Sequence, residues 1–227
     1  MAITTWIKYL RKPKFTDPIA IVGSPGLRSI GKLAIDHLVD KLQAELIAEL
    51  YSTHFPIVFH TKPAYAPHPR FPGDAGIKIG VKGIEFPKVQ FHFNASPELI
   101  ITNGYHANFN GQYEVAEKVL DLCEVFGVKM MIVLAGHGRK GKEVCCAATN
   151  LRIIEEMEKK YGIEVEYEGP FYGFSGLVFG LAKLRGIEAL CLFGKTESNT
   201  EESEYPDENA ANALLKHLSQ ILKLNLI

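Results

Sequence analysis

The chain has almost no net charge and no long apolar run. Its 227 residues include 25 lysines and arginines against 26 aspartates and glutamates, a formal net charge of −1. This balance leaves no electrostatic attraction for nucleic acid or anionic lipid, so we expect neither as a partner. No apolar stretch approaches the roughly 20 residues that cross a bilayer, and the basic segment 1–15 lacks the apolar core of a signal peptide. We therefore expect a protein of the cytoplasm.

The spacings typical of metal sites and catalytic sites are missing too. The four cysteines (Cys123, Cys145, Cys146 and Cys191) form no C-x-x-C pair, and the eight histidines form no H-E-x-x-H pattern. Most of the cysteines lie among apolar or small residues, which favours buried, inert thiols. His37 falls in the apolar stripe of a helical pattern, and we interpret it as a core histidine. The sequence predicts no metal, no cofactor and no catalytic residue.

What the chain does contain is a near match to a nucleotide-binding loop. Gly26-x-x-x-x-Gly31-Lys32 follows an apolar strand pattern at 19–22. A working P-loop continues with a serine or threonine that holds Mg²⁺, whereas this chain has Leu33. Leu33 also belongs to an apolar stripe at helical spacing, so the segment is better explained as a tight strand-to-helix turn.

This interpretation gives each residue of the turn a structural role. We expect Gly23, Gly26 and Gly31 to allow close backbone packing, and Lys32 to lie in solvent. Ser29 is the candidate N-cap of the helix that follows. Phosphate binding by this loop is the minor alternative.

Two further motifs are also incomplete. Residues 136–141 fit G-x-G-x-x-G, but no helical pattern begins at the last glycine, as a dinucleotide site requires. Residues 173–177 resemble a nucleophile elbow, yet Leu177 replaces its final glycine. We therefore expect Ser175 to cap a helix.

Strand and helix patterns alternate along the chain. Strand patterns cover 19–22, 44–51, 99–102, 129–135, 144–149, 163–167 and 187–193; helical patterns cover 30–42, 112–126, 150–161, 177–184 and 207–223. This alternation predicts an α/β fold, a single three-layer domain over 1–227 with a mainly parallel sheet.

Other segments are assigned by composition. Residues 77–81 and 89–93 alternate in polarity and are predicted to pair as an inserted β-hairpin, after an irregular proline-rich stretch at 55–76. Residues 1–17 are expected to form an N-terminal arm and 195–206 a solvated acidic loop. The C-terminal helix, 207–223, has a continuous apolar stripe and should dock on the body.

Several small, polar or glycine-rich segments follow the predicted strands. In open parallel sheets, ligands bind beyond the carboxyl ends of the strands. The strand ends therefore predict the location of a ligand crevice without specifying a reaction. Its candidate residues are Gly23, Ser24, Gly26, Asn103, Gly104, Gly136 and His137.

The order and spacing of the longer segments resemble the proteasome assembly chaperone 2 family, in particular its archaeal-type members. The matching stretches are IVGSPGLRSIGKLAIDHLVDKLQAELIAELYS, ITNG, GQYEVAEKVLDLCEVFGVKMMIVLAG, VCCAATN, GFSGLVFGLAKLRGIEALCLFGKT and YPDENAANALLKHLSQILKL. Together they cover most of the chain from residue 18 onward. The resemblance implies a phosphorylase- or hydrolase-like α/β fold and assembly into homo-oligomers. It also implies binding of proteasome α-subunits without catalysis. Some members carry an ATP-grasp label, which no residue pattern in this chain supports.

The chain departs from the family at its end. Some archaeal members carry a hydrophobic-Tyr-X tail that inserts between proteasome α-subunits, whereas this chain has Leu226 at the tyrosine position. We therefore do not expect docking through the tail. Two alternatives to the leading hypothesis are open. One is a small-molecule enzyme of phosphorylase-like fold that acts on a nucleoside or phosphorylated ligand. The other is an oligomeric scaffold with a partner other than the proteasome.

Overall fold

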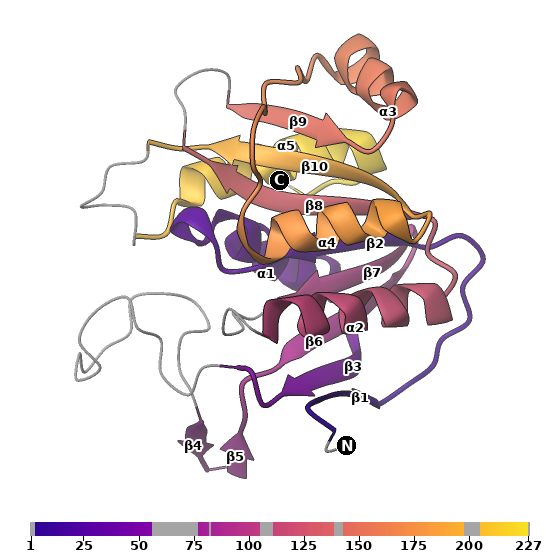
Figure 1. Cartoon of the computed structure of the whole chain (residues 1–227), viewed down its shortest axis with the longest axis vertical. Helices are drawn as coiled ribbons and strands as arrows, with labels where there is room; N and C mark the ends of the chain where they lie inside the picture. Colours follow the sequence, from indigo (N-terminus) through magenta and orange to yellow (C-terminus); the bar gives the residue numbers. More distant parts are fainter. Residues whose placement is uncertain are drawn as a thin grey trace.

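A computed structural model of the chain describes residues 3–55, 77–81, 83–104, 111–138, 143–197 and 205–226. Its centre is one eight-stranded sheet (Figure 1). The strands lie in the order β1 (Thr5–Tyr9), β3 (Glu45–Ser52), β6 (Val89–Ala95), β7 (Glu98–Asn103), β2 (Ile19–Gly23), β8 (Met130–His137), β10 (Glu188–Lys195) and β9 (Val144–Ala148).

The middle of this sheet is parallel and its flanks are antiparallel. Strands β7, β2, β8 and β10 pair in parallel, while β1, β3 and β6 on one side and β9 on the other pair antiparallel. The parallel strands are continuous apolar runs because both of their faces are buried. Their carboxyl ends therefore meet at a single edge of the sheet.

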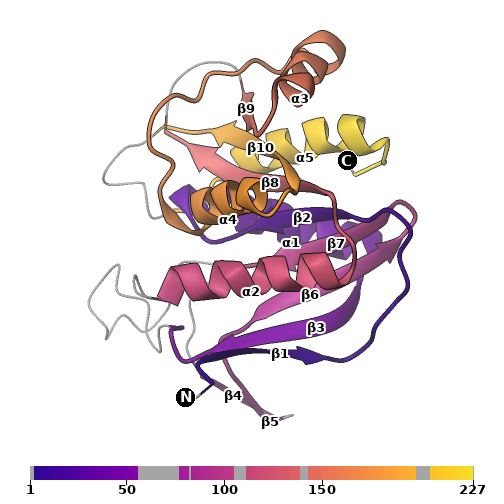
Figure 2. The ribbon, with the colours of Figure 1, turned by 45° about the vertical axis from the view of Figure 1, so that its right-hand side comes forward.

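Helices cover both faces of the sheet, in three layers (Figures 1 and 2). Helices α2 (Gln112–Val125) and α4 (Gly173–Leu184) pack together on one face, and α1 (Ile30–Leu42) and α5 (Glu208–Leu222) pack together on the other. Each face has its own apolar core. The arrangement confirms the predicted α/β fold. A shorter helix, α3 (Leu151–Glu156), runs into a π-helical turn (Met157–Tyr161) beside the edge strand β9.

The starts of two helices differ in how well they match expectation. Asp207 caps α5 by accepting a hydrogen bond from the amide of Ala210, close to the predicted start. Ser29 stands at the N-cap position of α1 but has a left-handed backbone (φ 53°), and its side chain makes no capping bond. The hydroxyl cannot reach the first-turn amides from that backbone conformation.

The predicted β-hairpin pairs differently from expectation. β4 (Lys78–Gly80) pairs with β5 (Gly83–Glu85) in a separate two-stranded sheet. Residues 89–93 instead belong to β6, inside the main sheet between β3 and β7. The alternating pattern of 89–93 fits a strand whose two faces differ in burial, and such a strand can pair with several neighbours.

Two other segments also differ from expectation. Residues 5–9 of the expected N-terminal arm form the edge strand β1, in which Trp6 stacks on Tyr51. Residues 163–167 make only an isolated bridge, between Val165 and Cys146. The proline-rich stretch 56–76 and residues 198–204 of the acidic loop lie outside the described residues.

Candidate functional site

A cavity of about 300 Å³ opens at the carboxyl ends of β2 and β8. Three segments supply most of its lining: the turn after β2, the end of β8, and the chain that leads into α4. The lining residues are Ser24, Pro25, Gly26, Leu27, Gly31, Gln112, Ala135, Gly136, His137, Gly138, Tyr167, Phe171, Tyr172, Gly173, Phe174 and Ser175. We call this cavity the strand-end crevice.

Four of the seven candidate site residues line the strand-end crevice: Ser24, Gly26, Gly136 and His137. The other three lie beside it. The amide of Gly104 donates to the carbonyl oxygen of Gly23 (2.7 Å), which joins the ends of β2 and β7 behind the lining. Asn103 donates instead to Asp36 on α1 (2.7 Å), so its side chain serves the opposite face of the sheet. Side chains alternate between the faces of a strand, which explains this separation.

The turn between β2 and α1 confirms two of the three expected glycine roles. A Cβ on Gly23 would lie 2.5 Å from the carbonyl oxygen of Gly31, and a Cβ on Gly31 would lie 2.3 Å from the carbonyl oxygen of Leu134. Gly26 meets only one atom within 4 Å, at 3.9 Å, so close packing does not require glycine there. The space beside Gly26 belongs to the crevice.

Lys32 was expected in solvent, and this expectation is wrong. Its side chain is only 10% exposed, and its ammonium group donates to Asp36 at 2.6 Å. The partner lies one helical turn ahead on α1, and its second oxygen accepts from Asn103. The lysine therefore belongs to a part-buried polar group on the α1 face and is not among the lining residues of the crevice.

His37 was interpreted as a core histidine, and this is also wrong. Its side chain is 42% exposed, and its Nε2 lies 3.6 Å from the carboxylate of Glu208 on α5. The apolar stripe of α1 passes beside it, through the buried Ile30, Leu33 and Leu38. A residue at the border of an apolar helical stripe can point toward the core or toward solvent, and the sequence spacing alone does not distinguish these two orientations.

The hydroxyl groups of Ser24 and Ser175 meet in the crevice, 3.2 Å apart. Both residues are buried, with 5% and 8% of their surface exposed. Ser175 does not cap a helix as predicted, because α4 already begins at Gly173 and holds Ser175 in its first turn. The nucleophile-elbow alternative gains no support, because the described partner of Ser175 is another hydroxyl.

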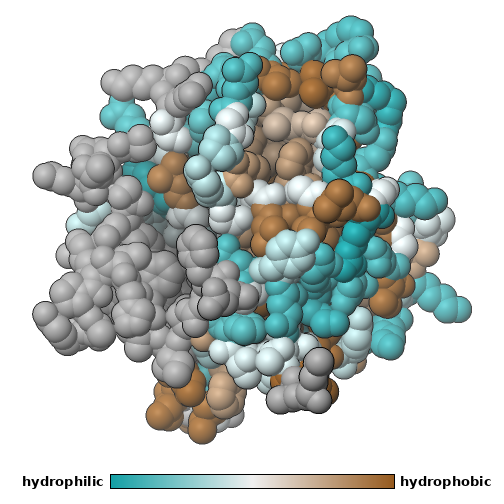
Figure 3. Space-filling model, viewed as in Figure 1, coloured by the Kyte–Doolittle hydropathy of each residue, from teal (hydrophilic) through white to brown (hydrophobic). Residues whose placement is uncertain are grey.

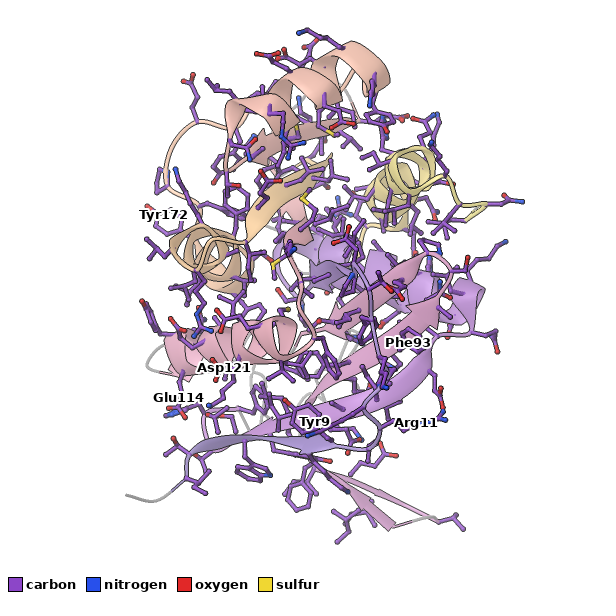
Figure 4. All side chains as sticks on the ribbon, turned by 90° about the vertical axis from the view of Figure 1, so that its right-hand side faces the viewer. Tyr9, Arg11, Phe93, Glu114, Asp121 and Tyr172 are labelled. Carbon is purple, nitrogen blue, oxygen red and sulfur yellow. The ribbon has the colours of Figure 1, made fainter. Side chains whose placement is uncertain are left out.

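One wall of the crevice is aromatic. The ring of His137 lies 4.9 Å from that of Tyr167, which stacks on Phe193 at 4.6 Å with an interplanar angle of 11°. Phe171 lies 5.0 Å from Phe193 and lengthens this wall. Tyr172 is 81% exposed at the rim, where Figure 4 labels it. No sequence pattern predicted this wall, although aromatic residues are frequent between positions 167 and 174.

An ion pair with one buried partner lies next to Tyr167 of the aromatic wall. Lys195, at the end of β10, pairs with Glu166, and its side chain is only 3% exposed. The neighbouring Cys145 is buried, and burial raises the pKa of its thiol to about 11. A thiol with this pKa is a poor nucleophile at neutral pH.

A second cavity, of about 600 Å³, lies on the outer strands of the sheet. It runs between β1, β3 and the β4–β5 hairpin and is lined by Trp6, Lys8, Tyr51, Ser52, Thr53, Phe55, Ile77, Phe86 and Pro87. We call it the edge groove. Tyr51, one of its lining residues, donates to Glu49 (2.8 Å), which also accepts a hydrogen bond from Lys88 (2.6 Å). Burial raises the pKa of Tyr51, and the bond to Glu49 adds to this, to about 12.

The other face of these outer strands is covered by α2. Figure 4 shows Glu114 and Asp121 on this helix above β1, which holds Tyr9. Glu114 accepts from Thr4 and lies 3.1 Å from His54, so the start of α2 is tied to the residue before β1 and to the turn after β3. The face of β1 and β3 that points away from α2 is therefore the face that lines the edge groove.

No metal or membrane feature is found in the described part of the chain. Among these residues, no three His, Cys, Asp or Glu side chains are grouped so that they could hold a metal ion. None of the described helices combines the length and apolar character needed to cross a bilayer.

Comparisons with known proteins agree with this fold. PbaB of Pyrococcus furiosus, described as an archaeal proteasome activator, is 31% identical, with a TM-score of 0.79 over 98% of this chain and 90% of PbaB. PbaA of the same organism, described as an archaeal homolog of proteasome-assembly chaperone, is 21% identical, with a TM-score of 0.73 over 98% of this chain and 83% of PbaA. The uncharacterized protein MJ1210 of Methanocaldococcus jannaschii is 27% identical over 93% of this chain and 78% of its own length. The profile of the PAC2 family matches residues 20–227, nearly the whole chain, so the protein belongs to the PAC2 family.

Proposed function

We propose that the protein is a homo-oligomer of the cytoplasm that binds proteasome α-subunits through its surface and does not act by catalysis. Its membership of the PAC2 family and its similarity to PbaB, described as a proteasome activator, support this role. The described residues add a surface suited to a protein partner, and this surface is the observation that carries the proposal.

That surface is the projecting β4–β5 hairpin. Ile79, Val81, Ile84 and Phe86 are 87%, 108%, 62% and 55% exposed. Figure 3 shows hydrophobic side chains at the lower end of the molecule, where Figure 1 places β4 and β5. A two-stranded hairpin has no core of its own and is marginally stable in water. An apolar hairpin that projects from the body is therefore suited to burial against another chain.

The edge groove continues this apolar surface. Ile77 and Phe86, which flank the hairpin, line the groove together with Trp6, which is 44% exposed. A concave aromatic groove beside a projecting apolar element is typical of an interface, whose energetic centre is commonly an aromatic side chain in a pocket. Tryptophan and tyrosine are both enriched at such centres.

Substitutions that introduce a negative charge into the hairpin test the proposal directly. We expect Ile79→Asp and Val81→Asp to weaken co-purification with proteasome α-subunits at least tenfold. Both side chains are exposed in the isolated chain, so Tm should change by less than about 2 °C. The matched control is Leu151→Asp on α3, a residue that is 74% exposed and outside the hairpin. Equal binding by all four proteins would refute the role of this surface.

The oligomer is measured separately by light scattering after size exclusion. A dissociated oligomer with intact α-subunit binding would assign the hairpin to self-association. An intact oligomer that binds no α-subunit at micromolar concentration would favour the scaffold alternative, with a partner other than the proteasome. These outcomes separate the two interfaces that the proposal contains.

A further inference from the structure

The start of helix α4 at the strand-end crevice has no side-chain cap. Tyr172, at the N-cap position of α4, gives no side-chain hydrogen bond to its helix. By contrast, Asn150 and Asp207 cap α3 and α5 through their side chains. The first amides of a helix carry partial positive charge and need acceptors. At α4 no side-chain cap among the described residues supplies one, and the start of this helix lines the crevice.

The Ser24 and Ser175 hydroxyls point independently to a ligand. Two hydroxyl groups carry two protons, and their mutual bond uses only one. Within the described ranges, these side chains bond only to each other. One buried O–H group therefore has donor capacity to spare, and it lines the crevice. A donor in this position is suited to an oxygen acceptor on a bound molecule.

The remaining lining accepts a planar group. The His137 and Tyr167 rings and Phe171 provide flat surfaces, and Gly26 leaves the opposite side open. No Asp or Glu is found among the described lining residues. A volume of about 300 Å³ equals about ten water molecules at ~30 Å³ each. It is at the lower end of the range for small-molecule sites.

We propose that the strand-end crevice binds a small planar molecule carrying a phosphate or carboxylate group, of nucleoside-monophosphate size or smaller. The oxyanion accepts from the first-turn amides of α4 and from the spare hydroxyl of the Ser24–Ser175 pair. The planar part lies against His137 and Tyr167. This site is separate from the hairpin surface and would give the protein a metabolite-responsive element in addition to partner binding.

Titration with defined probes tests the site. We use adenosine monophosphate, adenosine, benzoate and inorganic phosphate, each up to 10 mM, and follow amide resonances by two-dimensional NMR and Tm by thermal shift. The proposal expects adenosine monophosphate or benzoate to shift the amides of Gly173, Phe174 and Gln112 and to raise Tm. At 100-fold excess over Kd the rise should be about 5 °C. Adenosine or phosphate alone should bind at least tenfold more weakly.

The balance between the probes identifies the source of the oxyanion. A response to adenosine monophosphate alone assigns a phosphate, and a response to benzoate alone assigns a carboxylate. A response to adenosine that equals the response to adenosine monophosphate overturns the anion part of the proposal. Unchanged amides at residues 112 and 173–175 with every probe overturn the site itself, and they leave α-subunit binding untouched.

Variants check that binding occurs in the crevice. The double variants Ser24→Ala/Ser175→Ala and Ser24→Cys/Ser175→Cys should each raise the Kd of the responding probe at least fivefold, because each removes both hydroxyls, whereas a single variant would leave one free hydroxyl donor. The matched control is Ser52→Ala, which removes a hydroxyl bonded to Thr5 on β1, outside the crevice. Two independent variants keep the test decisive if one of them fails to fold. An unchanged Kd in both variants refutes the assigned site.

Discussion

Gly31 lies so close to Leu134 that a Cβ on the glycine would stand 2.3 Å from the leucine carbonyl oxygen. This approach allows α1 to begin directly against the end of β8. We expect Gly31→Ala to lower the free energy of unfolding by about 1–3 kcal/mol, because backbone atoms must move to admit the methyl group. Urea denaturation followed by circular dichroism measures the change.

Gly180 provides the control for this substitution. It lies inside α4, and no atom lies within 4 Å of the place that an alanine methyl group would take, so Gly180→Ala meets open space. Alanine is the better helix former, and we expect a gain of up to about 1 kcal/mol. A loss of similar size for both variants would show that crowding at Leu134 is not the cause.

The second prediction concerns the ion pair between the buried Lys32 and the partly exposed Asp36. Asp36→Ala leaves a lysine with a 10% exposed side chain without its carboxylate, and it also removes the acceptor of Asn103. We expect a loss of about 1–3 kcal/mol in the free energy of unfolding. The same change at Glu155, whose partner Lys159 is 74% exposed, should cost less than about 0.5 kcal/mol. Equal losses would contradict the burial argument.

Asp207 predicts a dependence of stability on pH. Burial raises the pKa of this carboxyl, but hydrogen bonds from Thr196 and the Ala210 amide and the charge of Arg28 together bring it below its ordinary value. A depressed folded-state pKa stabilises the protein above the unfolded value of about 3.9, and this contribution is lost as pH falls through the folded value.

The variant Asp207→Asn isolates this contribution. Wild type should be more stable than the variant by about 0.5–2 kcal/mol at pH 7. The difference should shrink below pH 4, where wild type becomes protonated and the two side chains become similar. Urea denaturation at pH 7, 5, 4 and 3 measures it. A difference that stays constant down to pH 3 would contradict the assigned interactions.

The cysteines should be unreactive in the folded protein. All four are buried, and burial raises the pKa of Cys123 and Cys146 to about 12. We expect Ellman's reagent at pH 8 to label none of the four within minutes, and to label all four in guanidinium chloride. Rapid labelling of a single thiol in native buffer would show that a cysteine is accessible.

The parallel centre of the sheet was predictable because its strands are long apolar runs. β2, β8 and β10 are buried on both faces, so their sequences carry a signal that does not depend on their neighbours. The pairing of β6 was not predictable, since an alternating segment fits any neighbour that covers one of its faces. Its partners, β3 and β7, are fixed by tertiary packing.

The crevice was predictable in part for a related reason. The positions of the strand ends follow from the strand patterns. The segments at these ends contain Ser24, Gly26, Gly136 and His137, which line the crevice. The opposite wall comes from the non-periodic chain before α4, and no spacing rule places such a segment. Lys32 and Asp36 have the four-residue spacing of an exposed pair, so the sequence could not show that the lysine is buried.

The order of strands in the sheet also constrains how the chain folds. Ile21, at the centre of β2, pairs with Ile101 on one side and Ile132 on the other. During synthesis this apolar strand emerges early, and both of its neighbours appear only after many more residues have left the ribosome. Pairings so distant in sequence slow folding, and unpaired strands are prone to aggregate. We therefore expect nascent chains that end before β8 to depend on cellular chaperones, although the finished protein itself belongs to the PAC2 (proteasome assembly chaperone 2) family.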